Sequence, residues 1–463
     1  MLLWLTIFGG HLLMMGQHTR SESLFYYFRL EDHVPEDHLL RLIDRHISFA
    51  FVREKLKDFY SENGRPSIDP ELLLRILLIG YLYGVTSERR LVEELRMHLA
   101  WRWFTGLGFD QEIPHHSTFS KNRHGRFSES GLFEQLFEEI VVRCMEAGLV
   151  QGDHLSVDGS QILANASICS RIPREQLAEA AKVKCTVRKY LEELEQENAP
   201  YEPVHEQDHV STTDSDATYG SKVGPAEMGY YDNYLVDNKS CVIVGVQATA
   251  ARLSQESAAA RDMLTRFAEQ RGSMPESLAA DGAYGNGELL HWLEERRITP
   301  YMYTRENHSK KNPQLYQIDR FKHVPENNIY ICPEGKQLTY VGINKHNRTH
   351  IWSSTPARCR GCSQKDQCTT GSYRTIPIHI YEAARQKARE LANTEAFRHA
   401  QYQRRKVEAL FAELKNQIGL RRLRLRRIKH VREQFFLAAT AQNIKRLVRF
   451  LSNQPQQPAT AVV

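Results

Sequence analysis

The chain has 463 residues, of which 41% are apolar and 25% charged, and this composition predicts about two to four domains with substantial cores. No stretch reaches the roughly 18 consecutive apolar residues of a membrane helix, which excludes a polytopic membrane protein. Eight cysteines are too few for a disulfide scaffold, so we expect a reducing compartment and a cytoplasmic protein. The apolar N-terminus lacks the other features of a secretory signal and is expected to be a disordered leader.

Charge is distributed unevenly along the chain. The net charge is only +5, from 61 Lys and Arg against 56 Asp and Glu, yet residues 395–453 hold fifteen Lys and Arg against four Glu. This segment therefore carries +11 and the rest of the chain −6. Such asymmetry indicates a polyanionic partner such as DNA, although many basic helices are simply solvated.

Residues 25–147 carry apolar side chains at helical spacing throughout. Asp69 followed by Pro70 predicts a helix start, and a second helix is expected from about Ser87. The two helices form either a helix-turn-helix unit for DNA or an ordinary helical hairpin. The candidate phosphate contacts of this segment are Arg89, Arg90, Lys121 and Arg123.

Beyond residue 150 the pattern predicts a mixed α/β core. Residues 155–163 indicate a strand that carries Asp158, and residues 241–248 indicate an apolar strand buried on both faces. A third short strand runs directly into Asp281. Both aspartates precede a glycine and are expected near strand ends.

A cysteine cluster marks the polar segment 305–392. Cys359 and Cys362 have the spacing of a metal-binding pair, and Cys332 and Cys368 flank them. The four side chains either hold a structural zinc ion (Zn²⁺) or are free buried thiols, and a redox role is a third alternative.

These patterns divide the chain into consecutive segments. They are a leader (1–24), a helical DNA-binding domain (25–147), the first part of an α/β core (150–304, with an insertion at about 170–228), an insertion with the cysteine cluster (305–392), the C-terminal helices of the core (393–453) and a disordered tail (454–463).

Two of the acidic residues suit metal-dependent cleavage of a phosphodiester. Two divalent ions about 3.5 to 4 Å apart activate the attacking oxygen and stabilise the leaving one, and Mg²⁺ takes hard oxygen ligands. Asp158 and Asp281 are good candidates because the glycine beside each permits close approach.

Glu408 is the third candidate, on a predicted helix. Lys415 lies on the same helical face, and Arg404 and Arg405 lie about one turn earlier. Taken alone, an exposed helix with an Arg404–Glu408 ion pair is the simpler interpretation. Glu413 is the nearest competitor, but an ideal helix turns it about 140° away from Glu408, so both cannot face one metal.

Short motifs follow one another in a specific order along the chain. They lie at residues 64–70, 81–84, 87–91, 116–123, 157–160, 164–166, 280–285, 407–415 and 442–447. Together they resemble the Asp-Asp-Glu (DDE) transposases of bacterial insertion sequences, in the group with an N-terminal helical domain and a C-terminal Tyr-Arg-Glu-Lys signature. The resemblance extends over about residues 24–451. The spacing from the tyrosine to the arginine of the signature fits Tyr402 and Arg405, whereas the spacing from the arginine to the glutamate fits Arg404 and Glu408. Which of the two arginines is the signature arginine is therefore left open.

The resemblance implies an RNase H-like core with a mixed sheet and a catalytic site of Asp158, Asp281 and Glu408, with Lys415 beside them. It implies DNA cleavage that depends on Mg²⁺ (or Mn²⁺) and joining of the 3′-hydroxyl ends to target DNA. Its implied partners are double-stranded DNA, both element ends and target, and a second copy in a homodimer, in a bacterial, nucleoid-associated location. The further DNA contacts are Tyr402, Arg404, Arg405, Lys415, Arg421, Arg422 and Arg424.

Two other functions use the same segments. A domesticated, non-catalytic DNA-binding regulator needs only the helical and basic segments, and decayed carboxylates would reveal it, yet all three are present. An RNase H-like nuclease without strand transfer keeps the carboxylates, and the product of strand transfer separates it from a transposase.

Overall fold

The computed structural model describes residues 27–61, 63, 67–189, 209–220, 225–251, 253–304, 314–346 and 348–454. The predicted leader, parts of the insertion at about 170–228 and the predicted tail beyond residue 454 lie outside these ranges. In the described ranges, no helix is long and apolar enough to cross a membrane.

Helices alone make up the described N-terminal part of the chain. Their bounds are α1 Leu30–His33, α2 Leu39–His46, α3 Phe51–Leu56, η1 Lys57–Phe59, α4 Pro70–Leu82, α5 Glu88–Met97, α6 Leu99–Thr105, α7 His116–Asn122, η2 Arg123–Phe127, α8 Ser128–Ser130 and α9 Leu132–Glu146. The helix starts predicted at Asp69 and Ser87 are confirmed, because each of these side chains accepts a hydrogen bond from the first turn that follows it.

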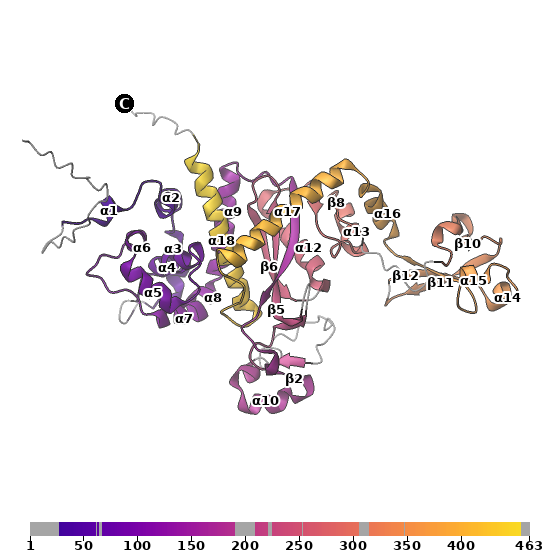
Figure 1. Ribbon diagram of the computed structural model, residues 1–463, viewed down its shortest axis with the longest axis horizontal. Coiled ribbons are helices and arrows are strands. Elements are labelled where there is room, and N and C mark those ends of the chain that lie inside the picture. Colours follow the sequence, from indigo (N-terminus) through magenta and orange to yellow (C-terminus); the bar gives the residue numbers. More distant parts are fainter. Residues whose placement is uncertain are drawn as a thin grey trace, which may run out of the picture.

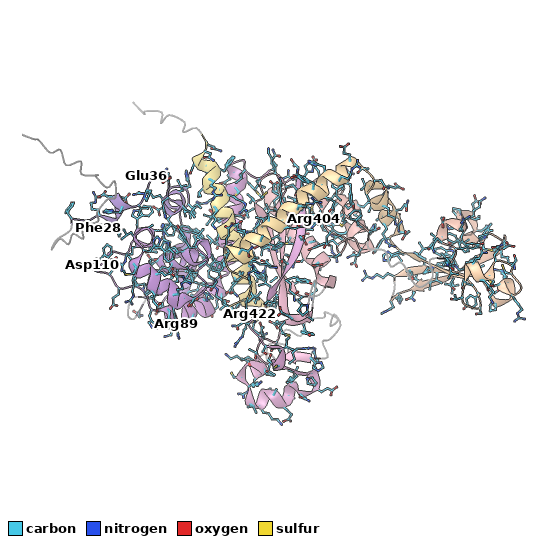
Figure 2. All side chains as sticks on the ribbon, in the orientation of Figure 1. Phe28, Glu36, Arg89, Asp110, Arg404 and Arg422 are labelled. Atoms are coloured by element: carbon cyan, nitrogen blue, oxygen red, sulfur yellow. The ribbon has the colours of Figure 1, made fainter. Side chains whose placement is uncertain are left out.

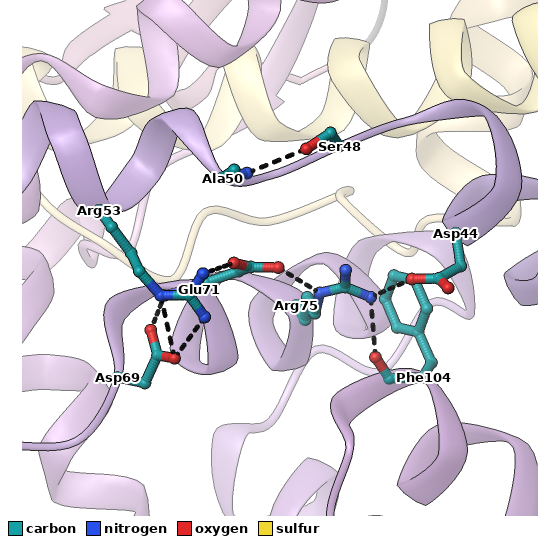
Figure 3. Close-up of polar contacts among 8 residues, drawn as sticks. All are labelled: Asp44, Ser48, Ala50, Arg53, Asp69, Glu71, Arg75 and Phe104. Atoms are coloured by element: carbon teal, nitrogen blue, oxygen red, sulfur yellow. Dashed lines mark hydrogen bonds and ion pairs between the residues drawn. The ribbon is translucent and has the colours of Figure 1, made fainter.

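Helix α4 is tied to its neighbours by a cap and a row of ion pairs (Figure 3). Asp69 accepts a hydrogen bond from the backbone N–H of Glu71 at 2.9 Å. Arg53 on α3 pairs with both Asp69 and Glu71 at 2.6 Å. Arg75 on α4 pairs with Glu71 at 3.0 Å and with Asp44 on α2 at 2.7 Å. The pairs therefore fix α2 and α3 against α4, although an exposed pair such as Arg53 with Asp69 adds only about 0.2 to 1 kcal/mol.

A mixed sheet forms the centre of the molecule. Its strands are β1 His154–Leu163, β4 Thr218–Gly220, β5 Glu227–Asp237, β6 Ile243–Ala250, β7 Ser277–Ala279 and β8 Thr299–Tyr301. The order is β4-β5-β1-β7-β8, and β6 also pairs with β5. The pairs β1–β5, β4–β5 and β5–β6 are antiparallel, whereas β1–β7 and β7–β8 are parallel. The mixed α/β class predicted from the sequence is therefore confirmed.

Long helices cover this sheet (Figure 1). They are α12 Leu253–Arg271, α13 Gly287–Glu295, α16 Glu382–Leu391, α17 Glu395–Asn416 and α18 Ile428–Ser452. Helix α12 packs against β5 and β6, α17 against β1, β7 and β8, and α18 against β6. Helix α18 also packs against α2, α4 and α9, so one buried cluster runs from the N-terminal helices into the sheet. This shared core argues against a separately folding fragment of residues 25–147, because such a fragment would expose the apolar face that α18 covers.

Two smaller units project from this body (Figure 1). The larger is a five-stranded antiparallel sheet in the order β13-β12-β11-β10-β9. Its elements are η5 Ile318–Arg320, β9 Lys322–Val324, η6 Pro325–Asn327, β10 Ile329–Ile331, β11 Gln337–Asn344, β12 Thr349–Ser353, α14 Pro356–Cys359, α15 Lys365–Cys368 and β13 Thr375–His379. The smaller comprises η3 Ile168–Ser170, β2 Arg171–Pro173, η4 Arg174–Gln176, α10 Leu177–Val183 and β3 His209–Ser211. Each has a small apolar core of its own.

The side chain of Asn443 joins α18 to the sheet. Its Oδ1 accepts a hydrogen bond from the Ile243 N–H at 2.9 Å, and its Nδ2 donates to the Ile243 carbonyl at 2.7 Å. We expect Asn443→Leu to lower the free energy of unfolding by about 2 to 4 kcal/mol, because each buried polar group left unsatisfied costs about 1 to 3 kcal/mol. Urea unfolding measures this change. Asn453→Leu, at an exposed position after the same helix, should cost less than about 0.5 kcal/mol, and equal losses in both variants would contradict the assignment.

Candidate active site

The parallel pairing of β1 with β7 brings the two aspartates side by side. Ser156 lies opposite Ala279, and two further residues along each chain lead to Asp158 and Asp281. Strand β7 ends at Ala279, whereas β1 continues to Leu163. Asp281 therefore follows a strand end, as predicted. The prediction that Asp158 lies near a strand end is wrong, because Asp158 lies in the middle of β1, where its parallel neighbour has stopped.

Asp158 is held in place from two directions. Its Oδ1 accepts a hydrogen bond from the Gly159 N–H at 2.8 Å, and its Oδ2 accepts one from Arg404 at 2.8 Å. A side chain at residue 159 would place its Cβ only 2.7 Å from Oδ1 of Asn233 on β5. Glycine is therefore required at residue 159 because Asn233 approaches the strand so closely.

Arg404 lies between two of the three candidate carboxylates. Its Nη1 is 2.8 Å from Asp158, and its Nη2 is 3.4 Å from Glu408 on the same face of α17. Its Nε donates to Gln401, whose amide in turn donates to the carbonyls of Ala280 and Tyr301 at 2.9 and 2.6 Å. The helix is thus fixed to the ends of β7 and β8. Arg405, the alternative in the sequence, is exposed.

The predicted catalytic residues line one open cavity of about 610 Å³. It is bounded by Asp158, Gly159, Ser160, Gln161, Leu163, Asp281, Arg404, Glu408, Phe411, Ala412 and Lys415. Across the ranges that the structure describes, no three acidic, His or Cys side chains are close enough together to hold a metal ion. Carboxylates are the hard oxygen ligands that Mg²⁺ prefers, and the Arg404 guanidinium lies between two of them, Asp158 and Glu408.

Glu413 does not compete for this cavity. It pairs with Arg446 on α18 at 2.9 Å and accepts a hydrogen bond from Gln442 at 3.1 Å. The predicted rotation of Glu413 away from Glu408 is confirmed.

Comparisons with known proteins match both ends of the chain. Residues 28–125 match the family described as "Transposase domain (DUF772)", and residues 331–448 match the "Transposase DDE domain". The chain therefore carries a transposase domain near its N-terminal end and a transposase DDE domain near its C-terminal end, and the two matches support a DDE transposase of insertion-sequence type. The second match includes Glu408, whereas Asp158 and Asp281 lie outside both matched regions.

Among solved structures, the chain is similar to the piggyBac transposase synaptic complex with hairpin DNA, at 10% identity over 91% of this chain and 76% of the other, with a TM-score of 0.34. It is also similar to the Mos1 transposase paired-end complex with left transposon end, at 9% identity over 80% of this chain and 85% of the other, with a TM-score of 0.18. Both scores are too low to support a structural argument. No curated protein matches the sequence.

The basic residues predicted to contact DNA differ in their availability. Arg89, Arg90, Lys121, Tyr402, Arg405, Arg421 and Arg422 are exposed. In the view of Figure 2, Arg422 lies between Arg89 and Arg404. Arg123 is 6% exposed in an ion pair with Glu88 at 2.5 Å, and the guanidinium of Arg424 lies 4.9 Å from the ring centre of Tyr81. These two arginines stabilise the packing of this transposase and are poorly placed to meet a phosphate.

The four cysteines of the insertion surround one small cavity of about 30 Å³. All four are free, and in the part of the chain that the structure describes no set of three ligands is arranged for a metal. The hypothesis of a zinc site is therefore not supported. Cys332 and Cys368 pack against the apolar core of the five-stranded sheet, and burial raises the pKa of the Cys368 thiol, so these residues act as small apolar side chains.

Sequence reasoning missed several buried polar residues next to the cavity. Asp232, Asn233, Glu256 and Tyr284 are all fully buried. Burial raises the pKa of Asp232, and the charge of Lys415 acts in the opposite direction. Tyr284 belongs to the motif that contains Asp281, but its role was not assigned. Glu256 gave no local signal, because a glutamate early in an amphipathic helix is usually solvated.

We expect the cysteines to react in an order set by burial. Iodoacetamide at pH 8 should modify the exposed Cys169 and Cys185 first and Cys368 slowly. Cys144 should stay unmodified, because burial raises the pKa of its thiol to about 12. Mass spectrometry of the native protein measures this order. A matched sample with EDTA should give the same result, and faster modification of Cys359 or Cys362 in EDTA would restore the zinc hypothesis.

Proposed function

We propose that this transposase binds the ends of its insertion sequence, cleaves the DNA there and joins the 3′-hydroxyl ends to target DNA. The observation that carries the proposal is the single cavity that gathers Asp158, Asp281, Glu408 and Lys415 from three distant segments of the chain. The mixed sheet, with an antiparallel half joined to a parallel half at β1, supports an RNase H-like core.

We assign the metal ligands to Asp158, Asp281 and Glu408, which would hold Mg²⁺ or Mn²⁺. When bound, the metal supplies an activated attacking oxygen and a stabilised leaving oxygen. Arg404 must break its ion pair with Asp158 or with Glu408 before all three carboxylates can serve as metal ligands. Its side chain reaches an open cavity, so a rotation toward solvent allows this without a change in the helix.

The cations of the cavity are suited to the DNA backbone. Lys415 and the released guanidinium of Arg404 line the same space as the carboxylates and would orient a phosphate against them. A second cavity of about 660 Å³ shares Leu163 with the first and is lined by Arg422 and Arg426. We therefore propose that the DNA backbone follows these two cavities, with affinity that falls steeply with salt. The homodimer expected from the resemblance remains a prediction.

The first test removes each proposed ligand separately. Asp158→Asn, Asp281→Asn and Glu408→Gln should each reduce Mg²⁺-dependent cleavage of element-end DNA by more than about 100-fold, since loss of even a group behind a metal ligand costs 10- to 100-fold. End binding, measured by gel shift, should change little because carboxylates contribute little to phosphate affinity. Glu395→Gln, at an exposed position in the first turn of the same helix, is the matched control and should cleave at nearly the wild-type rate. A ligand variant as active as this control would lose its assignment.

The second test decides between the two arginines of the signature. Arg404→Gln should reduce cleavage by about 10- to 100-fold, since a hydrogen bond between charged groups contributes about 1.5 to 3 kcal/mol. Arg405→Gln should have a much smaller effect, because Arg405 is exposed beside the cavity and does not line it. Single-turnover cleavage of the same DNA measures both. A larger loss for Arg405→Gln would transfer the role to Arg405.

A further inference from the structure

A layer of buried oxygen atoms lies beneath the candidate active site. Asn233, Glu256 and Tyr284 come from β5, from the first turn of α12 and from the turn after Asp281, and each side chain is fully buried. Two atoms of this layer, Oδ1 of Asn233 and the Tyr284 hydroxyl, have no hydrogen-bond partner in the described structure. A buried polar atom without a partner is costly, so this layer requires an explanation.

Glu256 faces the strand beside Asp158. Its Oε1 lies 3.1 Å from the position that a Cβ of residue 159 would take. Glycine at residue 159 therefore leaves space for the Glu256 carboxylate beside β1. Asn233 approaches the same position from β5, where its Nδ2 donates to Gln247 and Thr249 at 2.9 and 3.0 Å. These bonds turn Oδ1 of Asn233 toward Gly159 and leave no room there for a larger residue.

Tyr284 belongs to the turn that carries Asp281, because its backbone N–H donates to the Asp281 carbonyl at 3.2 Å. Its pKa is raised well above the usual value, first by burial and then by the charges of Glu256, Asp158 and Asp281, with Arg404 acting in the opposite direction. The hydroxyl therefore lies in the field of three carboxylates that come from three different elements. Burying like charges together is unfavourable unless a cation joins them.

We propose that Glu256 and Tyr284 are positioning residues, which hold Asp158 and Asp281 ready for a divalent cation from beneath the cavity. This inference rests on the proposed function. The Glu256 carboxylate adds negative charge behind the site, and the Tyr284 hydroxyl would donate to an aspartate oxygen when the site holds a cation. Residues that stand behind metal ligands in this way set the orientation of the ligands and the affinity for the metal.

The test measures Mn²⁺ binding to the full chain by calorimetric titration, without DNA. We expect Glu256→Gln and Tyr284→Phe each to weaken Mn²⁺ binding by about 10- to 100-fold. Tyr230→Phe is the matched control, because Tyr230 is an equally buried tyrosine on β5 whose hydroxyl donates to Asp214 at 2.7 Å, away from the two aspartates of the site. This control should bind Mn²⁺ with wild-type affinity.

Thermal melting in EDTA separates positioning from a purely structural role. Tyr284→Phe removes a hydroxyl that has no hydrogen-bond partner among the described residues, so its Tm in EDTA should match that of wild type, whereas its Mn²⁺-dependent rise in Tm should be smaller. If Glu256→Gln does not fold, the Mn²⁺ affinity of Tyr284→Phe alone tests the positioning role. A folded variant with wild-type Mn²⁺ affinity overturns the role of the residue it replaces. Wild-type protein whose Mn²⁺ binding is absent, or is unaffected by Asp158→Asn, would instead contradict the proposed function.

Discussion

The parallel register of β1 and β7 is the constraint on which the rest of the site depends. This register brings Asp158 and Asp281 to adjacent positions, and α17 adds Glu408 to the same cavity. Carboxylates that line one cavity favour cations close by. Arg404 provides one within the described structure, and the proposed divalent metal would provide more charge than any side chain. The strand register that groups the carboxylates therefore also creates the need for a cation, and a divalent cation is what the proposed cleavage reaction uses.

Helix α17 determines where that charge is placed. Its N-terminal half is fixed to β7 and β8 through Gln401, and its C-terminal half is fixed to α18 through Glu413. Between these two attachments the helix presents Arg404 and Glu408 to the cavity. Because each attachment involves a buried or half-buried polar group, rotation of the helix would break several hydrogen bonds at once. The rigid helix leaves the arginine side chain as the adjustable part of the site.

The sequence predicted the parts of this arrangement that have local signals. Asp69 and Ser87 cap helices as expected, and the motifs around Asp158, Asp281 and Glu408 identified residues that share a cavity. Strand β5 was not predicted, since its buried polar residues hide the apolar pattern of a central strand. The buried layer of Asn233, Glu256 and Tyr284 below the site was not predicted either, because polar residues are expected to be exposed. Whether a glutamate or an asparagine is buried depends on tertiary packing, which no local spacing encodes.

The side-chain amide of Asn443 also affects how the sheet meets other chains. Strand β6 is an edge strand, because within the described sheet it pairs only with β5. The amide occupies both outward hydrogen-bonding groups of Ile243, and α18 packs along the same strand. An edge strand with free N–H and C=O groups is a template for pairing with another molecule. Helix α18 therefore protects β6 from edge-to-edge pairing, and a nascent chain that still lacks this helix exposes the strand until the helix has been made.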